Sequence, residues 1–174
     1  MDLMRKILIS SLFVVLLGAR ASLALESHPL MPGALAVAPA VEFTRFGFSI
    51  YYAQLWAPEG QYKKDAPFIL TLTYSRDITR ERILDASLTE MKKLGIPVER
   101  YPQWREQLSS VLPDVKQGDT LTGLYTPGKG SQFFYQNQMT GVLDDALSDS
   151  FFSIWLDTRT SEPEMRSALI GQKK

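Results

Sequence analysis

The sequence predicts an α+β fold, in which one antiparallel sheet carries a layer of helices on one face. Two observations lead to this class. The hydrophobic period changes from two to a helical spacing and back again in long blocks, giving strands, helices, strands and helices in that order. The chain also contains no cysteine, so neither a disulfide nor a thiolate metal site supports the fold, and it must depend on one apolar core.

The N-terminus has the features of a secretory signal peptide, which we assign to residues 1–24. Two basic residues in positions 1–6 precede an apolar run from Ile7 to Leu17 and a stretch of small residues. Cleavage after Ala21 or after Ala24 fits this pattern, and Ala24 is preferred. A membrane anchor is the competing interpretation, but the run is shorter than the ~20 residues of a membrane span and Arg20 ends it. We expect a periplasmic or secreted protein without a stable membrane span.

Cleavage after Ala24 leaves a flexible lead segment, residues 25–40, and one domain, residues 41–171. The processed chain has 16 basic and 18 acidic residues. This balance, without a basic cluster, excludes nucleic acid as an expected partner. The single histidine, His28, lies in the lead segment among prolines, and no chemistry is assigned to it. The sequence leaves the oligomeric state open.

The first half of the domain reads as two strands followed by two helices. Between residues 46 and 56, aromatic and branched side chains occur at both odd and even positions, which is typical of a strand covered on both faces. Residues 68–74 form a second strand after a Pro-Gly turn. Thr79 is placed to cap a helix over 80–94, and Pro102 opens another helix that continues to residue 112.

The second half returns to period two and then ends in helices. Residues 120–126, 131–135 and 139–143 alternate as the strands of a β-meander. An aromatic helix around Phe151 to Trp155 follows, and Ser161 to Glu164 reads as a capping box that opens a last helix ending at Gly171.

Three motifs suggest chemistry, but each is better explained by local structure. Gly123 to Lys129 matches the start of a phosphate-binding P-loop, yet an aromatic strand follows it instead of a helix, so a hairpin turn is predicted. The pair Asp144 and Asp145 stands at a helix start, where carboxylates complement the helix dipole, although a cation site is the alternative. Lys116 to Asp119 ends in Gly-Asp just before a strand, which is typical of a turn. With one histidine, no Ser-His or Cys-His pair is available, and neither a metal nor a cofactor is expected.

Several segments, in this order along the chain, resemble the bacterial chalcone isomerase-like family. The resemblance extends from about Ala34 to Gly171. It is carried by these residues: Phe48 to Pro58, Tyr74 to Ile78, Pro113 to Asp119, Phe151 to Thr160, Arg166, and Leu169 to Gly171. The family resembles the plant enzymes, which implies an open-faced β-sandwich with an apolar cleft between sheet and helices.

The resemblance also implies where the polar groups of the plant cleft should fall. The strand threonine falls at Tyr51, the helix asparagine at or near Ala86, and the tyrosine of that helix in a gap before Ile83. Arg76 takes the place of the family's lysine, and Thr160 that of a substrate-contacting threonine.

Arg45 is a candidate for the cleft's guanidinium. Both Arg45 and Arg76 have an alternative interpretation as surface charges at a strand edge. Because the groups that orient the nucleophile are missing, we expect no true chalcone isomerase activity.

The first functional hypothesis is a non-catalytic binder of a fatty acid or another apolar small molecule, since superfamily relatives are known as fatty-acid binders and export brings the protein near membrane lipids. Arg76 is the expected carboxylate partner. The candidate ligand-binding residues are Arg76, Thr160, Tyr51, Tyr52, Tyr74, Phe134, Trp155 and Arg45, and plain core packing is the alternative for the aromatic ones. A cofactor-independent isomerase acting on an enone and a structural or interaction module are the other two hypotheses.

Overall fold

A computed structural model describes residues 26–172 of the 174-residue chain, so the predicted signal peptide lies outside the described residues. In the described part, an open antiparallel sheet of seven strands is combined with four α-helices and one 3₁₀ turn, which confirms the α+β class. The elements are β1 (Ala34–Ala36), β2 (Val41–Arg45), β3 (Phe48–Pro58), β4 (Phe68–Tyr74), α1 (Arg80–Lys93), α2 (Tyr101–Val111), β5 (Thr120–Thr126), β6 (Gly130–Tyr135), β7 (Gln138–Leu143), α3 (Asp145–Leu156) and α4 (Pro163–Leu169).

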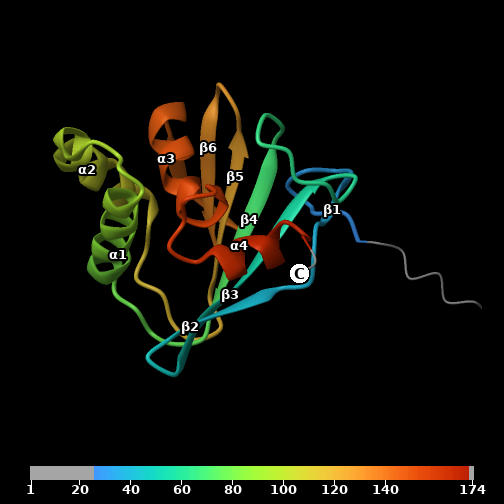
Figure 1. Cartoon of the computed structure of the whole chain (residues 1–174), viewed down its shortest axis with the longest axis horizontal. Helices are drawn as coiled ribbons and strands as arrows, with labels where there is room; N and C mark the ends of the chain where they lie inside the picture. Colours follow the sequence, from blue (N-terminus) through green and yellow to red (C-terminus); the bar gives the residue numbers. More distant parts are fainter. Residues whose placement is uncertain (1–25, 173–174) are drawn as a thin grey trace, which may run out of the picture.

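The strands follow the order β1-β3-β4-β5-β6-β7, and every pairing is antiparallel (Figure 1). The outer edge of the 11-residue strand β3 is shared, because β1 pairs with its last three residues and β2 with its first half. The meander predicted over residues 120–143 is confirmed as β5, β6 and β7, and residues 127–129 form the predicted hairpin turn.

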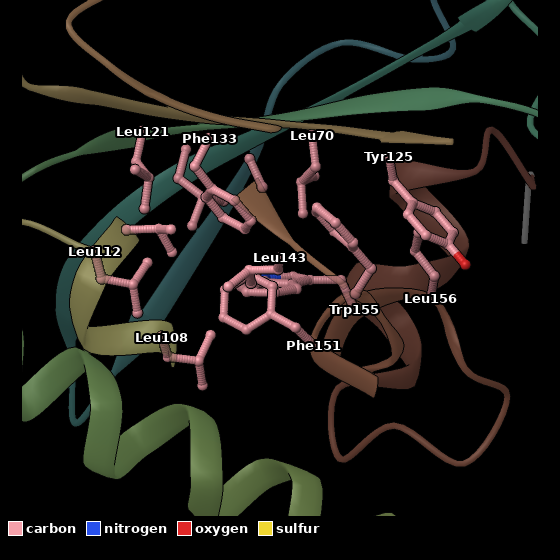
Figure 2. Close-up of a cluster of buried hydrophobic side chains, with 14 of the residues drawn as sticks. Leu70, Leu108, Leu112, Leu121, Tyr125, Phe133, Leu143, Phe151, Trp155 and Leu156 are labelled. Carbon is pink, nitrogen blue, oxygen red and sulfur yellow. The ribbon is translucent and has the colours of Figure 1, made fainter. Parts of the chain in front are cut away.

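One face of the sheet and the helices together enclose the apolar core. Figure 2 shows side chains of the sheet, among them Leu70 and Phe133, directed toward Phe151 and Trp155 of α3. Gly123 of β5 shows how closely the layers approach, since a Cβ there would lie 2.6 Å from the Cζ atom of Phe152. A glycine is therefore needed where α3 crosses the sheet.

Two of the predicted helix starts are confirmed, but their capping differs. Helix α1 begins after Thr79, whose side chain makes no capping hydrogen bond; the backbone N–H of Arg80 instead donates to the Asp114 carboxylate at 2.7 Å. Helix α3 begins after Asp144, and its carboxylate accepts the N–H of Leu147 at 2.8 Å. Asp144 is thus an N-cap, as its position at a helix start suggested.

The capping box predicted at Ser161 is wrong. The N-cap of α4 is Glu162, without a side-chain capping bond, and Ser161 donates its hydroxyl hydrogen bond to Glu90 of α1 at 2.6 Å. The reason is tertiary: α4 follows a short loop after α3, and this loop brings Ser161 beside α1 instead of over the first turn of its own helix.

The start of the first predicted strand also needs correction. Phe46 and Gly47 form the turn between β2 and β3, with φ of 52° and 79°, so the strand begins at Phe48 and the preceding residues form a strand of their own. The prediction that this strand is covered on both faces is wrong for the first half of the strand, because Phe48 is 61% exposed and Tyr52 is 44% exposed.

The range expected to be a flexible lead contains part of the sheet. Ala34–Ala36 forms β1, and His28 packs its ring edge-on against Trp56 at 5.1 Å between centroids. The Nδ1 atom of His28 accepts the N–H of Leu30 at 3.2 Å, so this residue is held by contacts with the lead segment and with β3.

The turn before β5 is held by Asp119. Its carboxylate accepts hydrogen bonds from the Lys116 N–H at 2.7 Å, the Tyr135 hydroxyl at 2.6 Å and the Gln136 side-chain amide at 2.7 Å. The hydrogen bond from Tyr135 is the main reason that the pKa of Asp119 lies below its ordinary value. This confirms a structural role for the Gly-Asp motif.

Within residues 26–172, no helix has the length and apolar character required to cross a bilayer.

Candidate ligand-binding site

A cavity of about 190 Å³ lies between the inner face of the sheet and the helices α1, α3 and α4. Its walls are mostly apolar and its polar residues gather in α1, in β2 and around the start of α4. The lining residues are Phe43, Arg45, Ile50, Tyr51, Leu72, Tyr74, Ile78, Arg82, Ile83, Ala86, Ser87, Glu90, Leu121, Phe151, Ile154, Trp155, Ser161, Glu162, Met165 and Arg166.

A β-bulge in β3 shapes one side of the cavity. Phe43 pairs with Tyr51 and Thr44 pairs with Ser49, which leaves Ile50 as an extra residue between them. In a regular strand two consecutive side chains point to opposite faces, but at a bulge they can share one face. Ile50 and Tyr51 therefore both line the cavity.

Two tyrosines and a tryptophan supply the polar groups of the cavity wall that is formed by β3, β4 and α3. The Nε1–H of Trp155 donates to the hydroxyl oxygen of Tyr51 at 3.0 Å, and the rings of Tyr51 and Tyr74 meet edge-on at 6.0 Å. Burial raises the pKa of both phenols well above their ordinary value. At neutral pH both hydroxyls are therefore uncharged, and neither provides a phenolate base.

Tyr74 differs from Tyr51 in one respect that matters for binding. The residue is 4% exposed, and its hydroxyl forms no side-chain hydrogen bond with a described residue. The oxygen of Tyr74 is not among the buried side-chain polar atoms that lack a partner, because it is open to the cavity. An oxygen atom of a bound molecule can supply a partner there. Tyr74 is therefore an available neutral donor on the cavity wall.

The rim of the cavity carries both paired and unpaired charges. The carboxylate of Glu90 is held by Lys93 at 2.7 Å and by Ser161 at 2.6 Å. Burial alone would raise the pKa of Glu90, but these two hydrogen bonds outweigh it and the pKa is lowered. Arg45 and Arg82 are exposed and form no salt bridge among the described residues. They are the exposed cationic groups that a ligand anion can reach. A third arginine of the lining, Arg166, is half-buried, and its Nε–H donates to the carbonyl of Leu156 at 2.8 Å.

Half of the residues expected at the site line the cavity. Arg45, Tyr51, Tyr74 and Trp155 come together there from four different elements, β2, β3, β4 and α3.

The other four expected residues do not line this cavity. Arg76 follows β4, is exposed, and places its guanidinium 5.2 Å from the centre of the Phe48 ring. Thr160 is buried in the α3–α4 loop, where its hydroxyl donates to the carbonyl of Ile154 at 2.6 Å and accepts the N–H of Glu162.

Tyr52 and Phe134 are absent from the cavity because of strand parity. Their neighbours Tyr51 and Phe133 occupy the inner face of the sheet, so these two side chains point to the opposite face. The hydroxyl of Tyr52 donates to Glu42 at 3.2 Å.

Sequence reasoning placed Ala86 of helix α1 at the cleft but missed the charged residues of this helix. Arg82, Ala86 and Glu90 recur every four residues and form a strip beside the buried residues of this helix, Leu84, Ser87 and Met91. The spacing was visible in the sequence, but an alanine between two charged residues resembles an ordinary solvated face. Ser161, Met165 and Arg166 were missed because only the tertiary position of α4 brings them to the cavity.

A profile of the chalcone isomerase-like family matches residues 44–171. The chain belongs to this family. Among solved structures, the chain is similar to the fatty-acid binding protein of Arabidopsis thaliana, with a TM-score of 0.61 and 11% sequence identity. The alignment covers 83% of this chain and 95% of the plant chain. No curated protein sequence matches the chain.

For this chalcone isomerase-like protein, the cavity tests the residue pairing that the resemblance implied. Tyr51 and Ala86, paired with the family's threonine and asparagine, both line the cavity. At the position paired with asparagine, the side chain of Ala86 has no polar atom. Among the described residues there is also no group of three or more histidine, cysteine or acidic side chains arranged to hold a metal ion. What the cavity offers is apolar surface, uncharged hydroxyls, the three arginines Arg45, Arg82 and Arg166, and the two carboxylates of Glu90 and Glu162.

Proposed function

We propose that the protein is an exported, non-catalytic binder of a fatty acid or a similar small apolar carboxylic acid. The observation that carries the proposal is the composition of the cavity: an apolar and aromatic interior, with Arg45 and Arg82 at its rim and without a salt bridge to any residue in 26–172. Such a surface holds a hydrocarbon chain by burial and orients it through a few polar groups.

The carboxylate partner in this proposal differs from the one expected from the sequence. Arg76 lies outside the cavity and stacks on Phe48, whereas Arg45 and Arg82 line it. A guanidinium binds a carboxylate through charge-assisted hydrogen bonds. The unpaired hydroxyl of Tyr74 adds a neutral donor for a ligand oxygen.

The size of the cavity sets the length of the ligand. A cavity of about 150 Å³ accommodates a molecule such as benzene, and pockets for drug-sized ligands measure about 300–1,000 Å³. At about 190 Å³, the cavity suits a short or medium acyl chain. A longer chain would extend through the mouth into solvent, where additional methylene groups gain little.

The fold similarity to a fatty-acid binding protein supports the proposal at the level of architecture. The predicted signal peptide supports export. The alternative of an interaction module whose cleft is filled by its own side chains is disfavoured by the cavity itself. No observation in the site favours an isomerase over a binder, because the expected polar partner Arg76 does not face the cavity.

The test is thermal stabilisation of the purified protein by a series of straight-chain fatty acids. We expect the largest shift for medium chains and a loss of about tenfold or more in affinity when Arg45 and Arg82 are both changed to glutamine. Arg76→Gln is the control, since it removes an exposed arginine that lies outside the cavity. Absence of stabilisation by every chain, or equal loss in the control, would overturn the proposal.

A further inference from the structure

The hairpin between β2 and β3 presents two phenylalanines to solvent. Phe46 is 88% exposed and Phe48 is 61% exposed, the highest exposures among the large apolar side chains given for the described residues together with Val142 at 63%. Figure 1 shows that this hairpin projects beyond the lower end of the sheet. We call Arg45, Phe46, Gly47, Phe48 and Arg76 the hairpin tip.

The aromatic residues of the tip are accompanied by positive charge. The guanidinium of Arg45 lies 5.5 Å from the centre of the Phe46 ring, and that of Arg76 lies 5.2 Å from the centre of the Phe48 ring. Neither arginine forms a salt bridge within residues 26–172. Residues 43–50 include no acidic residue. Carboxylates are nearby, since Arg45 contributes to lowering the pKa of Glu90 and Asp77 follows Arg76 in the sequence. The tip therefore combines exposed rings with two arginines that form no salt bridge among the described residues.

The backbone gives no reason for an aromatic residue at the turn. Phe46 adopts a φ of 52°, a left-handed conformation that is unfavourable for a bulky side chain and is better tolerated by glycine or asparagine. Because the ring is almost fully exposed, packing does not compensate for this cost. An exposed aromatic residue in a strained turn is consistent with a functional contact.

The tip is continuous with the cavity. Arg45 belongs to both, since it lines the cavity and stacks on Phe46, and the neighbouring bulge residue Ile50 also lines it. A surface bound to the tip would therefore lie next to the rim of the cavity, where the ligand of the proposed function would enter.

We propose that the hairpin tip docks on an anionic lipid bilayer, with Phe46 and Phe48 inserted at the interface and Arg45 and Arg76 at the level of the head groups. Aromatic rings and arginines are residues that anchor proteins at this depth, and each basic residue near an anionic surface adds about fivefold to the affinity. A lipid surface fits better than a protein groove, because its negative charge complements the two arginines and its acyl region accepts both rings. Docking in this orientation brings the cavity rim to the membrane surface.

The proposal is independent of ligand binding, so its test uses vesicles without added fatty acid. Flotation of the protein is compared for phosphatidylcholine vesicles with and without phosphatidylglycerol. We expect binding to the vesicles that contain phosphatidylglycerol, and weaker binding in roughly 1 M salt, where surface charges are screened within about 3 Å.

Three variants separate the tip from other apolar surface. Phe46→Asn with Phe48→Ser should reduce binding by at least about tenfold, and Arg45→Gln with Arg76→Gln by about twentyfold at low salt. Met139→Ser with Val142→Ser removes two other exposed apolar side chains, 55% and 63% exposed, from β7 at the far edge of the sheet, and should leave binding unchanged. All variants share one N-terminus, so any binding by that segment is the same in each.

Two outcomes would overturn the docking proposal. One is equal flotation of the tip variant and the β7 variant. The other is a dimer in light scattering that becomes a monomer in the tip variant without any vesicle binding, since the tip would then be an interface between two copies of the chain. If the protein floats with the vesicles but binds no fatty acid, only the proposed function is contradicted and the docking proposal stands.

Discussion

Replacing the two cavity tyrosines by phenylalanine should have different effects on stability, although both changes remove one hydroxyl group. In Tyr51→Phe, the Trp155 Nε1–H loses the acceptor that lies 3.0 Å away. In Tyr74→Phe, no side-chain hydrogen bond to a described residue is lost, and the hydroxyl is not a buried unsatisfied group, because it is open to the cavity. The rings keep their packing in both variants.

The expected magnitudes follow from this difference. A buried donor left without its acceptor costs about 1–3 kcal/mol, and Trp155 is 8% exposed. Tyr51→Phe should therefore lower the free energy of unfolding by about 1–3 kcal/mol, with the lower end expected if water reaches the indole from the cavity. Tyr74→Phe should change it by less than about 0.5 kcal/mol.

Urea unfolding monitored by circular dichroism measures both values. For a chain of this size, each kcal/mol also corresponds to a shift of about 2–4 °C in the melting temperature. Equal destabilisation by the two substitutions would refute the assignment of the Tyr51 hydroxyl as a structural acceptor and that of the Tyr74 hydroxyl as free. Under the binding proposal, Tyr74→Phe should weaken the affinity for a medium-chain fatty acid while leaving stability intact.

Four further substitutions test the fold. Gly123→Ala should destabilise the protein by about 1–3 kcal/mol in urea unfolding, because its Cβ would approach the ring of Phe152 to 2.6 Å; a neutral result would show that α3 does not lie this close to β5. Asp144→Ala should cost about 1 kcal/mol by loss of the N-cap of α3, whereas Thr79→Ala, at an N-cap without a side-chain bond, should be nearly neutral in the same assay. The pKa of Asp119 is depressed in the folded protein, so its contribution is complete above the unfolded value of about 3.8 and is lost as pH falls through the lower folded value. Urea midpoints of the protein and of Asp119→Asn should therefore converge in acid, and a constant difference across pH would contradict this role.

Much of the fold follows from local patterns that the sequence displays directly. The helix predicted over residues 80–94 is observed as Arg80–Lys93, and the predicted meander is observed in β5, β6 and β7. These elements were predictable because their periodicity, Gly-containing turns and terminal residues agree with one another. Short edge strands such as β1, three residues long, lack enough sequence for such a pattern.

The candidate site could be predicted only in part. Tyr51, Tyr74 and Trp155 were expected from the family resemblance, and all three line the cavity. Tyr52 and Phe134 were placed incorrectly because the face of a strand residue depends on register, and a bulge or a shift of one residue reverses it. The sequence could not show that Arg82, and not Arg76, is a candidate carboxylate partner, because this depends on how α1 lies over the sheet.

By itself, therefore, the sequence determined the fold class, the main helices and strands, and an apolar cleft with few polar groups. It also determined the charge balance and the N-terminal pattern that predicts export. Tertiary structure decided which arginines reach the cavity, which tyrosine hydroxyl is left without a partner, and that the two phenylalanines of the hairpin tip are exposed. The physical reason is that periodicity depends on neighbours along the chain, whereas a cavity and an exposed patch depend on contacts between elements far apart in it.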